Sequence, residues 1–280
     1  MNNKNIFTIE QIINEINLNL EDIAKSIVAK EIFIEKNNLI KLYKQQFFFE
    51  IDCNRQHKYN WHQWGIVTHS RACMSLYDNE VKNYLKEWDK LEVIEKHLNE
   101  KIDGITKSKL IYIGILLHDL GKFKKHYTIE PNHKVKCSFS QHEVYSQKII
   151  LEDIYPLLHE YYKLSRNQIK YIATCAENHG LVRQIIKKAG INYSSEFIHS
   201  DKFKNILLNE LSELKKYKIE IGLLFFADSC AKTNIAFQDR TDIDILEDLR
   251  KQNLNQKLIK AVKQKEQSIK VAQHYFEIIL

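Results

Sequence analysis

The chain has 280 residues, of which 44% are hydrophobic, and it contains only 7 glycines and 2 prolines. This apolar content excludes a disordered protein, and the shortage of turn-forming residues argues against an all-β fold and predicts an all-α one. A formal net charge of +6 suits a polyanionic partner such as a nucleotide or nucleic acid, although a lysine-rich surface can serve solubility alone.

Three further classes are excluded by what the sequence lacks. No apolar run reaches the roughly 18 residues of a membrane-spanning helix, so we expect no membrane partner. The N-terminal sequence MNNKNIFTIEQIINEI lacks the basic and apolar regions of a signal peptide, which predicts a cytoplasmic protein. The 5 cysteines are scattered and form no CxxC pair, which argues against disulfides and a cysteine-rich zinc site.

The region before residue 50 predicts two or three helices without a catalytic pattern. Thr8 and Gln11 have the spacing of a capping box, and the isoleucines of IEQIINEI then recur at helical spacing. Residues 45–51, QQFFFEI, are ambiguous between a short strand and an irregular segment.

The first candidate ligand is a histidine in the next part of the chain. The polar and aromatic segment 54–64 predicts a loop, and the helix expected over 66–77 has His69 in its first turn. Residues 78–104 predict one charged amphipathic helix whose polar face is solvated.

The strongest pattern is the apolar run LIYIGILLHDLGKF at 110–123, which predicts a helix buried on every face. His118 and Asp119 at its end are costly to bury unless a partner satisfies them, and a divalent metal takes both as ligands. Gly121 would let the backbone turn there. Lys122 would then project a cation toward an anionic phosphate.

A polar segment without helical period follows Lys122 and predicts a long loop that is functional or mobile. Its lysines could bind a polyanion; they are Lys124, Lys125, Lys134 and Lys136. Ser140 and Glu143 predict a capping box for the next helix. His142 then lies in the first turn, where the positive helix end favours the neutral imidazole that binds metal.

Another helix begins with a capping box of Ser165 and Gln168. It ends in the sequence ENHG, which contains His179 and places Gly180 as the C-terminal cap. A buried histidine is thereby expected at the end of this helix.

The segment IEIGLLFFADSCA at 219–231 predicts a second buried helix, which carries Asp228. The simplest division of the chain is an N-terminal helical extension, 1–55, a main domain, 56–240, and a C-terminal helix within 241–280 that packs on it.

Six polar residues end or interrupt the apolar helices: His69, His118, Asp119, His142, His179 and Asp228. Their nitrogen and oxygen donors suit Mn, Fe, Co, Ni or Mg better than a cysteine-rich zinc site does. An aspartate beside a histidine can bridge two ions, and two ions about 4 Å apart form a template for phosphate hydrolysis by a metal-activated hydroxide. The other histidines are interpreted as hydrogen-bonded packing residues, apart from His62, which is left undecided.

The order His69, His118-Asp119, Asp228 resembles the HD superfamily of metal-dependent phosphohydrolases. HDLGK is a frequent form of the doublet of this family, and the added His142 and His179 resemble its dinuclear branches. These include the HD nuclease domain of CRISPR-associated helicases, HD-GYP phosphodiesterases and small dinucleoside-polyphosphate hydrolases. The segment YNWHQWGIVTHS is also similar to the start of the HD domain of bacterial tRNA nucleotidyltransferases.

The resemblance extends over roughly residues 60–235 and implies an all-α HD-domain bundle with extra N- and C-terminal helices. It implies two divalent ions: the first would be held by His69, His118, Asp119 and Asp228, and the second by Asp119, His142 and His179. Asp119 and Lys122 would be catalytic, and Lys122, Lys124 and Lys125 would contact the substrate.

Several alternatives stay open. The chain reads FKKHYTIEP where HD-GYP proteins have their GYP motif, which argues against a cyclic-di-GMP substrate. A nucleotide and a single-stranded nucleic acid compete as the substrate of a phosphohydrolase or phosphodiesterase. The alternative function is a nucleotide- or RNA-binding regulatory module without turnover, and a purely structural role for the six residues comes last.

Overall fold

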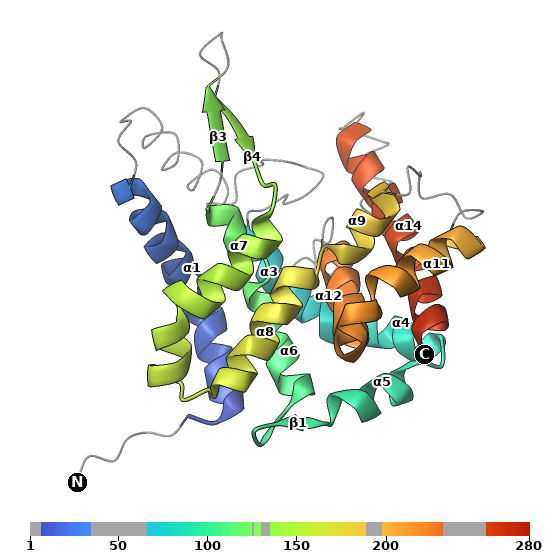
Figure 1. Cartoon of the computed structure of the whole chain (residues 1–280), viewed down its shortest axis with the longest axis horizontal. Coiled ribbons are helices and arrows are strands. Elements are labelled where there is room, and N and C mark those ends of the chain that lie inside the picture. Colours follow the sequence, from blue (N-terminus) through green and yellow to red (C-terminus); the bar gives the residue numbers. More distant parts are fainter. Residues whose placement is uncertain (1–6, 35–65, 125, 130–134, 189–197, 232–255) are drawn as a thin grey trace.

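The computed structural model describes residues 7–34, 66–124, 126–129, 135–188, 198–231 and 256–280. The predictions for 45–51, 54–64, Lys125 and the first part of the C-terminal helix lie outside these ranges. The described residues form an all-α fold, as predicted, with two short hairpins added to the helices (Figure 1).

The bounds of the elements are as follows. The α-helices are α1 (Ile9–Ile34), α3 (Ile66–Leu76), α4 (Lys82–Glu87), α5 (Leu91–Leu98), α6 (Lys107–Leu117), α7 (His142–Lys148), α8 (Arg166–Asn178), α9 (Leu181–Lys188), α11 (Asp201–Glu210), α12 (Lys218–Cys230) and α14 (Gln256–Ile279). The π-helical and 3₁₀ segments are η1 (Tyr77–Val81), η2 (Leu120–Phe123), η3 (Ile149–Asp153), η4 (Leu157–Tyr161) and η5 (Ser212–Tyr217). The strands are β1 (Lys101–Ile102), β2 (Ile105–Thr106), β3 (His126–Ile129) and β4 (Val135–Ser138).

Two apolar helices, α6 and α12, occupy the centre of the core. Every residue of α12 from Ile219 to Cys230 is buried, and α6 is buried almost throughout its second half. Helix α6 packs against α1, α3 and α8, while α12 packs against α3, α9 and α14. Polar groups at the ends of such helices cannot reach bulk water, so they must be satisfied by one another or by a ligand.

The N-terminal part of the chain is a layer on this core. Thr8 and Gln11 form the predicted capping box, with the Gln11 amide 3.3 Å from Thr8 Oγ1 and the Thr8 amide 2.8 Å from Gln11 Oε1. A single helix, α1, follows and buries Ile12, Ile16 and Leu20 against the bundle. None of the helices in the described ranges is long and apolar enough to cross a membrane.

The single helix predicted within 78–104 is wrong. The chain there forms η1, α4 and α5, and it turns between the last two at Asp89, which has a positive φ of 53°. The amide of Lys90 then donates to the carbonyl oxygen of Leu85 at 2.8 Å, which ends α4. Asp103 and Gly104, with φ of 46° and 91°, make the tight turn between β1 and β2 that Asp-Gly favours.

The long loop predicted after Lys122 is also wrong, because the segment forms an antiparallel hairpin. Strand β3 pairs with β4 in the register His126 to Ser138 and Ile129 to Val135. The hairpin projects from the helical body above α7 (Figure 1). In the sequence it lies between Asp119 and His142, so these two candidate ligands flank its base.

Candidate metal centre

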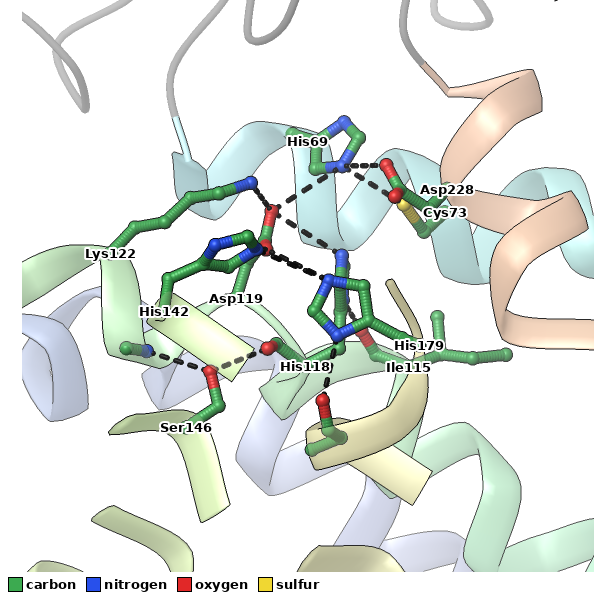
Figure 2. A network of polar contacts seen from close by, with 12 residues as sticks. His69, Cys73, Ile115, His118, Asp119, Lys122, His142, Ser146, His179 and Asp228 are labelled. Carbon is green, nitrogen blue, oxygen red and sulfur yellow. Dashed lines mark hydrogen bonds and ion pairs between the residues drawn. The ribbon is translucent and has the colours of Figure 1, made fainter. Parts of the chain in front are cut away.

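The six predicted residues come from five different elements and meet at one end of the central helices (Figure 2). His69 lies on α3, and Asp228 lies near the end of α12. His118 and Asp119 follow α6 directly, His142 is the first residue of α7, and His179 is the C-cap of α8. The structure therefore brings together side chains up to 159 positions apart, from residue 69 to residue 228.

Asp119 is the centre of the group and is fully buried, at 0% exposure. Its Oδ2 atom lies 3.3 Å from Nε2 of His118 and 3.6 Å from Nε2 of His69. Its Oδ1 atom lies 3.4 Å from Nε2 of His142 and 3.6 Å from Nε2 of His179. Each carboxylate oxygen thus faces a different pair of imidazoles, which is the arrangement that a bridging ligand requires.

The ring orientation of three histidines is set by the backbone. Nδ1 of His118, His142 and His179 lies within hydrogen-bond distance of a carbonyl oxygen, which can only accept. The acceptors are Ile115, Phe139 and Ala176, at 2.7, 2.8 and 2.7 Å. Each Nδ1 therefore carries the proton and donates, and the lone pair of the neutral ring is at Nε2, directed into the centre.

The result is a cluster of acceptors that face one another. Nε2 of His142 and Nε2 of His179 are only 3.3 Å apart, and neither can donate while its ring is neutral. The buried Nε2 of His118 has no hydrogen-bond partner among the described residues. Lone pairs held this closely need a cation or a proton between them.

The opposite side of the centre is formed by α3 and α12. Nε2 of His69 lies 3.0 Å from Oδ1 of Asp228 and 3.5 Å from Sγ of Cys73, one helical turn further along α3. The other carboxylate oxygen of Asp228 pairs with Nη1 of Arg183 from α9. The Arg183 guanidinium also contacts Ser229 Oγ at 3.3 Å.

Cys73 and Arg183 belong to the site but were not predicted from the sequence. Cys73 carried a recognisable signal, because positions four apart on a helix share one face and His69 was already a candidate. Arg183 carried none, since it lies in an amphipathic stretch whose charged residues are ordinarily solvated. The six predicted residues supply only nitrogen and oxygen donors, and Cys73 adds a thiol beside them.

The three predicted substrate lysines have different surroundings. Lys122 is buried, with Nζ 2.5 Å from Oδ2 of Asp119, so its ammonium is directed at the centre. Lys124 pairs instead with Asp153 at 2.9 Å, at the end of η3. Lys125 lies outside the described residues. Of these three lysines, only Lys122 has a described contact with the six residues.

The turn that carries the His-Asp doublet is held against α7 by a buried serine. Ser146 Oγ donates to the carbonyl oxygen of His118 at 2.5 Å and accepts from the amide of Gly121 at 2.8 Å. A Cβ atom on Gly121 would lie 1.9 Å from the carbonyl oxygen of His142. Gly121 is therefore required for close approach to α7, and the backbone turns there, as predicted, into η2 without a positive φ at Gly121.

The start of α7 differs from the prediction. Its N-cap is Gln141, with a left-handed φ of 60° and without a side-chain capping bond, so the predicted capping box of Ser140 and Glu143 does not form. His142 still occupies the first turn, and its Nδ1 is bound to Phe139. The predicted position is thus correct although its predicted cause is wrong.

The end of α8 also lies where it was predicted, but for a different structural reason. The capping box of Ser165 and Gln168 at its start is confirmed, but Gly180 at its end does not adopt a positive φ. A Cβ atom at Gly180 would lie 2.5 Å from Oε1 of Glu143. Gly180 therefore serves the close packing of α8 on α7, which brings His179 to His142.

The charges in the centre shift the pKa values of its members. Burial disfavours the charged form of Asp119, but the positive charges of His118 and Lys122 outweigh it and hold the pKa of this carboxyl well below its ordinary value. Arg183 does the same, against burial, for the pKa of Asp228. Burial lowers the pKa of His69 and, with the neighbouring His118, lowers the pKa of His179 further.

These residues could hold a metal ion. Two sets of donor atoms each lie within 4.8 Å of one another: His69, Cys73, His118 and Asp228 form one set, and His118, Asp119 and His179 form the other. The chemistry of both sets fits a divalent transition metal, because the backbone-bound imidazoles direct Nε2 into the centre. Burial opposes the charged form of His118, but the Asp119 carboxylate outweighs it and raises the pKa of His118, so a bound metal would take the place of that proton.

Histidines assigned to packing are found in hydrogen bonds away from this centre. Nε2 of His97 lies 2.9 Å from Glu220, Nδ1 of His159 lies 2.8 Å from the carbonyl oxygen of Leu164, and Nδ1 of His274 lies 2.8 Å from Glu277. Their surroundings offer the hydrogen-bonding partners that a packing role requires.

The sequence matches no protein-family model and no curated protein. The similarity to the HD superfamily therefore stays a prediction from the motifs, and the geometry of the centre is what carries the functional argument.

Proposed function

We propose that the protein is a dinuclear metal-dependent phosphohydrolase that cleaves a phosphoester or phosphoanhydride bond of a nucleotide or a single-stranded nucleic acid. The observation that carries the proposal is the position of Asp119, whose two buried oxygens each face a different pair of imidazoles. This arrangement favours two ions that share one carboxylate.

The ligand sets follow from these contacts. Asp119, His142 and His179 would hold one ion through Oδ1 and two Nε2 atoms. His69, His118 and Asp228 would hold the other, with Asp119 Oδ2 as the shared ligand. When bound, such a pair of ions supplies Lewis acidity that activates water and neutralises charge on the phosphoryl oxygens.

The protein's own residues do the positioning. Backbone carbonyl groups hold Nδ1 of three imidazoles, so no ring has to rotate or change its tautomer before binding. Ser146 fixes the turn that carries Asp119. The centre is therefore preorganised, which lowers the cost of assembling it around a substrate.

Two cations at the edge of the centre would contact the substrate. The Lys122 ammonium pairs with Asp119, and the Arg183 guanidinium pairs with Asp228. With the two carboxylates engaged in metal binding, Lys122 and Arg183 would be available for an anionic phosphate. Arg183 presents a planar set of donors suited to phosphate oxygens.

Hydrolysis of a generic aryl phosphodiester, followed by nucleotides and single-stranded oligonucleotides, tests the proposal. Protein loaded with Mn, Fe, Co, Ni or Mg should turn over at least one of these substrates, and Asp119→Ala should not. An Asp22→Ala variant is the matched control, because Asp22 is exposed on α1 and pairs with Lys25. Full activity in Asp119→Ala would refute the proposal.

The salt dependence of binding separates the two substrate classes. A polymer that contacts several phosphates releases counterions, so its affinity falls steeply with salt, whereas a mononucleotide shows a shallow dependence. Tight binding of either class without turnover by any metal-loaded form would favour the regulatory module over the enzyme.

A further inference from the structure

Cys73 is placed as a potential ligand on the α3 side of the centre. Its side chain is buried, at 1% exposure, and projects one turn after His69 from the same face of α3. Its Sγ atom is 3.5 Å from Nε2 of His69, and both lie with donor atoms of His118 and Asp228 in one set within 4.8 Å (Figure 2). The centre therefore has a sulfur donor beside its nitrogen and oxygen donors.

A second observation points to a ligand in the same place. Nε2 of His118 belongs to this set, is buried, and has no hydrogen-bond partner among the residues that the structure describes. In a tetrahedral site with bonds of about 2.0 Å to nitrogen and about 2.3 Å to sulfur, the two donors are about 3.5 Å apart. The observed separation of 3.5 Å between His69 Nε2 and Cys73 Sγ equals this value.

We propose that Cys73 supplies a thiolate ligand to the ion held by His69, His118 and Asp228, and that this position selects a thiophilic metal such as zinc, iron or cobalt. Binding breaks the S–H bond, and the proton leaves to the buffer. A soft sulfur donor disfavours Mg, Ca and Mn, which prefer oxygen. The inference rests on the proposed function, and it predicts that the two metal positions differ in their preferences.

The other described buried cysteines provide the contrast. Cys175 on α8 is fully buried, and its side chain packs against α6 at Gly114, where an added Cβ would lie 3.6 Å from Cys175 Cβ. It belongs to neither set of metal-donor atoms. Cys175→Ser therefore removes a buried thiol without touching the centre, which makes it the matched control for Cys73→Ser.

Cobalt titration followed by absorption spectroscopy tests the proposal. Wild type and Cys175→Ser should show both the d–d bands of bound cobalt and the near-ultraviolet charge-transfer band of a cobalt–thiolate bond. Cys73→Ser should keep d–d absorption and lose the charge-transfer band. We expect its cobalt affinity to fall more than about tenfold, since changes outside the ligand shell already cost 10–100-fold.

The wild-type spectrum alone can overturn the inference, whether or not Cys73→Ser folds. Cobalt bound without a charge-transfer band, together with retained hydrolysis, would refute the thiolate ligand and leave the proposed function intact. Persistence of the band in a folded Cys73→Ser protein would refute it equally. If wild type binds no cobalt at all, the dinuclear centre and the thiolate ligand both fail.

Discussion

The bundle of α6, α8 and α12 buries acidic groups at both of its ends, Glu220 at one and Asp119 and Asp228 at the other, and the two ends differ in how those groups are satisfied. At the amino-terminal end, Oε1 of Glu220 lies 2.9 Å from the hydroxyl of Tyr171, 2.9 Å from Nε2 of His97 and 3.8 Å from Nζ of Lys107. At the carboxyl-terminal end, Asp119 pairs with the Lys122 ammonium through Oδ2 and is otherwise surrounded by Nε2 atoms of imidazoles, three of which bond to backbone carbonyls through Nδ1.

The difference teaches that a buried carboxylate does not by itself indicate a metal site. Glu220 is fully buried, yet the hydroxyl of Tyr171 donates to it and the ammonium of Lys107 lies 3.8 Å away, so its negative charge is compensated within the protein. Around Asp119, Lys122 donates to Oδ2, but the backbone-bound imidazoles of His142 and His179 still present Nε2 to one another and to Oδ1. The surplus of acceptors, and not burial, is what calls for an added cation.

Removal of the Glu220 carboxylate should give the largest change in stability. Glu220→Ala leaves the hydroxyl of Tyr171 and Nε2 of His97 without their acceptor, which should lower the free energy of unfolding by about 3 kcal/mol, since each buried group left unsatisfied costs about 1–3 kcal/mol. Urea denaturation measures this change. Glu220→Gln keeps an oxygen acceptor and should lose less, and both variants should retain their metal content; loss of metal would contradict the separation of the two ends.

Removal of an imidazole at the other end should affect activity more than folding. His142→Ala should reduce hydrolysis by about 100-fold or more, equivalent to about 2.7 kcal/mol in the activation barrier. His97→Ala is the matched control, because His97 is a partly buried histidine that contacts Glu220. Comparable losses of activity in the two variants would show that the ends do not have separate roles.

The close approach to α7 of the turn that carries His118 and Asp119 can be tested by adding one methyl group. Gly121→Ala places Cβ 1.9 Å from the backbone oxygen of His142 and 2.6 Å from the Ser146 amide nitrogen, so the turn and α7 must separate. We expect a destabilisation of about 1–3 kcal/mol in thermal unfolding and weaker metal retention. Gly114→Ala on α6 meets an ordinary contact of 3.6 Å and should be neutral or slightly stabilising; equal effects would contradict the geometry.

The smallest effect should appear in the pH dependence of the metal-free protein. The pKa of His179 is lowered by burial and by His118, so below about pH 6.5 the unfolded chain binds a proton that the folded one does not. Stability associated with His179 is therefore lost as pH falls, by at most about 1.4 kcal/mol per pH unit. In EDTA-treated protein, His179→Gln should show a shallower decline in urea midpoint than wild type; an identical decline would contradict the depressed pKa.

The sequence was sufficient for the fold class and for the residues of the centre because both depend on local pattern. Apolar runs with a polar residue at their ends locate α6 and α12, and such residues have to meet inside an all-α bundle. The capping boxes at Thr8 and Ser165 are local in the same way. His118, Asp119 and Asp228 were therefore predictable without any tertiary information.

Most of the features that were not predicted depend on contacts between segments that are distant in the sequence. Neither Arg183 beside Asp228 nor the acceptor role of Glu220 can be inferred from its own helix, although Glu220 lies within the predicted buried segment. The hairpin of β3 and β4 carried a local signal that the prediction missed, because apolar and polar residues alternate in HYTI and in VKCS. The glycines at 121 and 180 are explained by approaching atoms of α7 and not by their own dihedral angles.

Elemental analysis of the purified protein tests the central claim most directly. Wild type prepared without chelator should carry about two transition-metal ions per chain, Glu220→Gln should carry the same amount, and Asp119→Ala should lose at least half, since Asp119 is the proposed shared ligand. Absence of bound metal from folded wild type, even after reloading with Mn, Fe, Co or Ni, would contradict the dinuclear centre, as would full occupancy in Asp119→Ala.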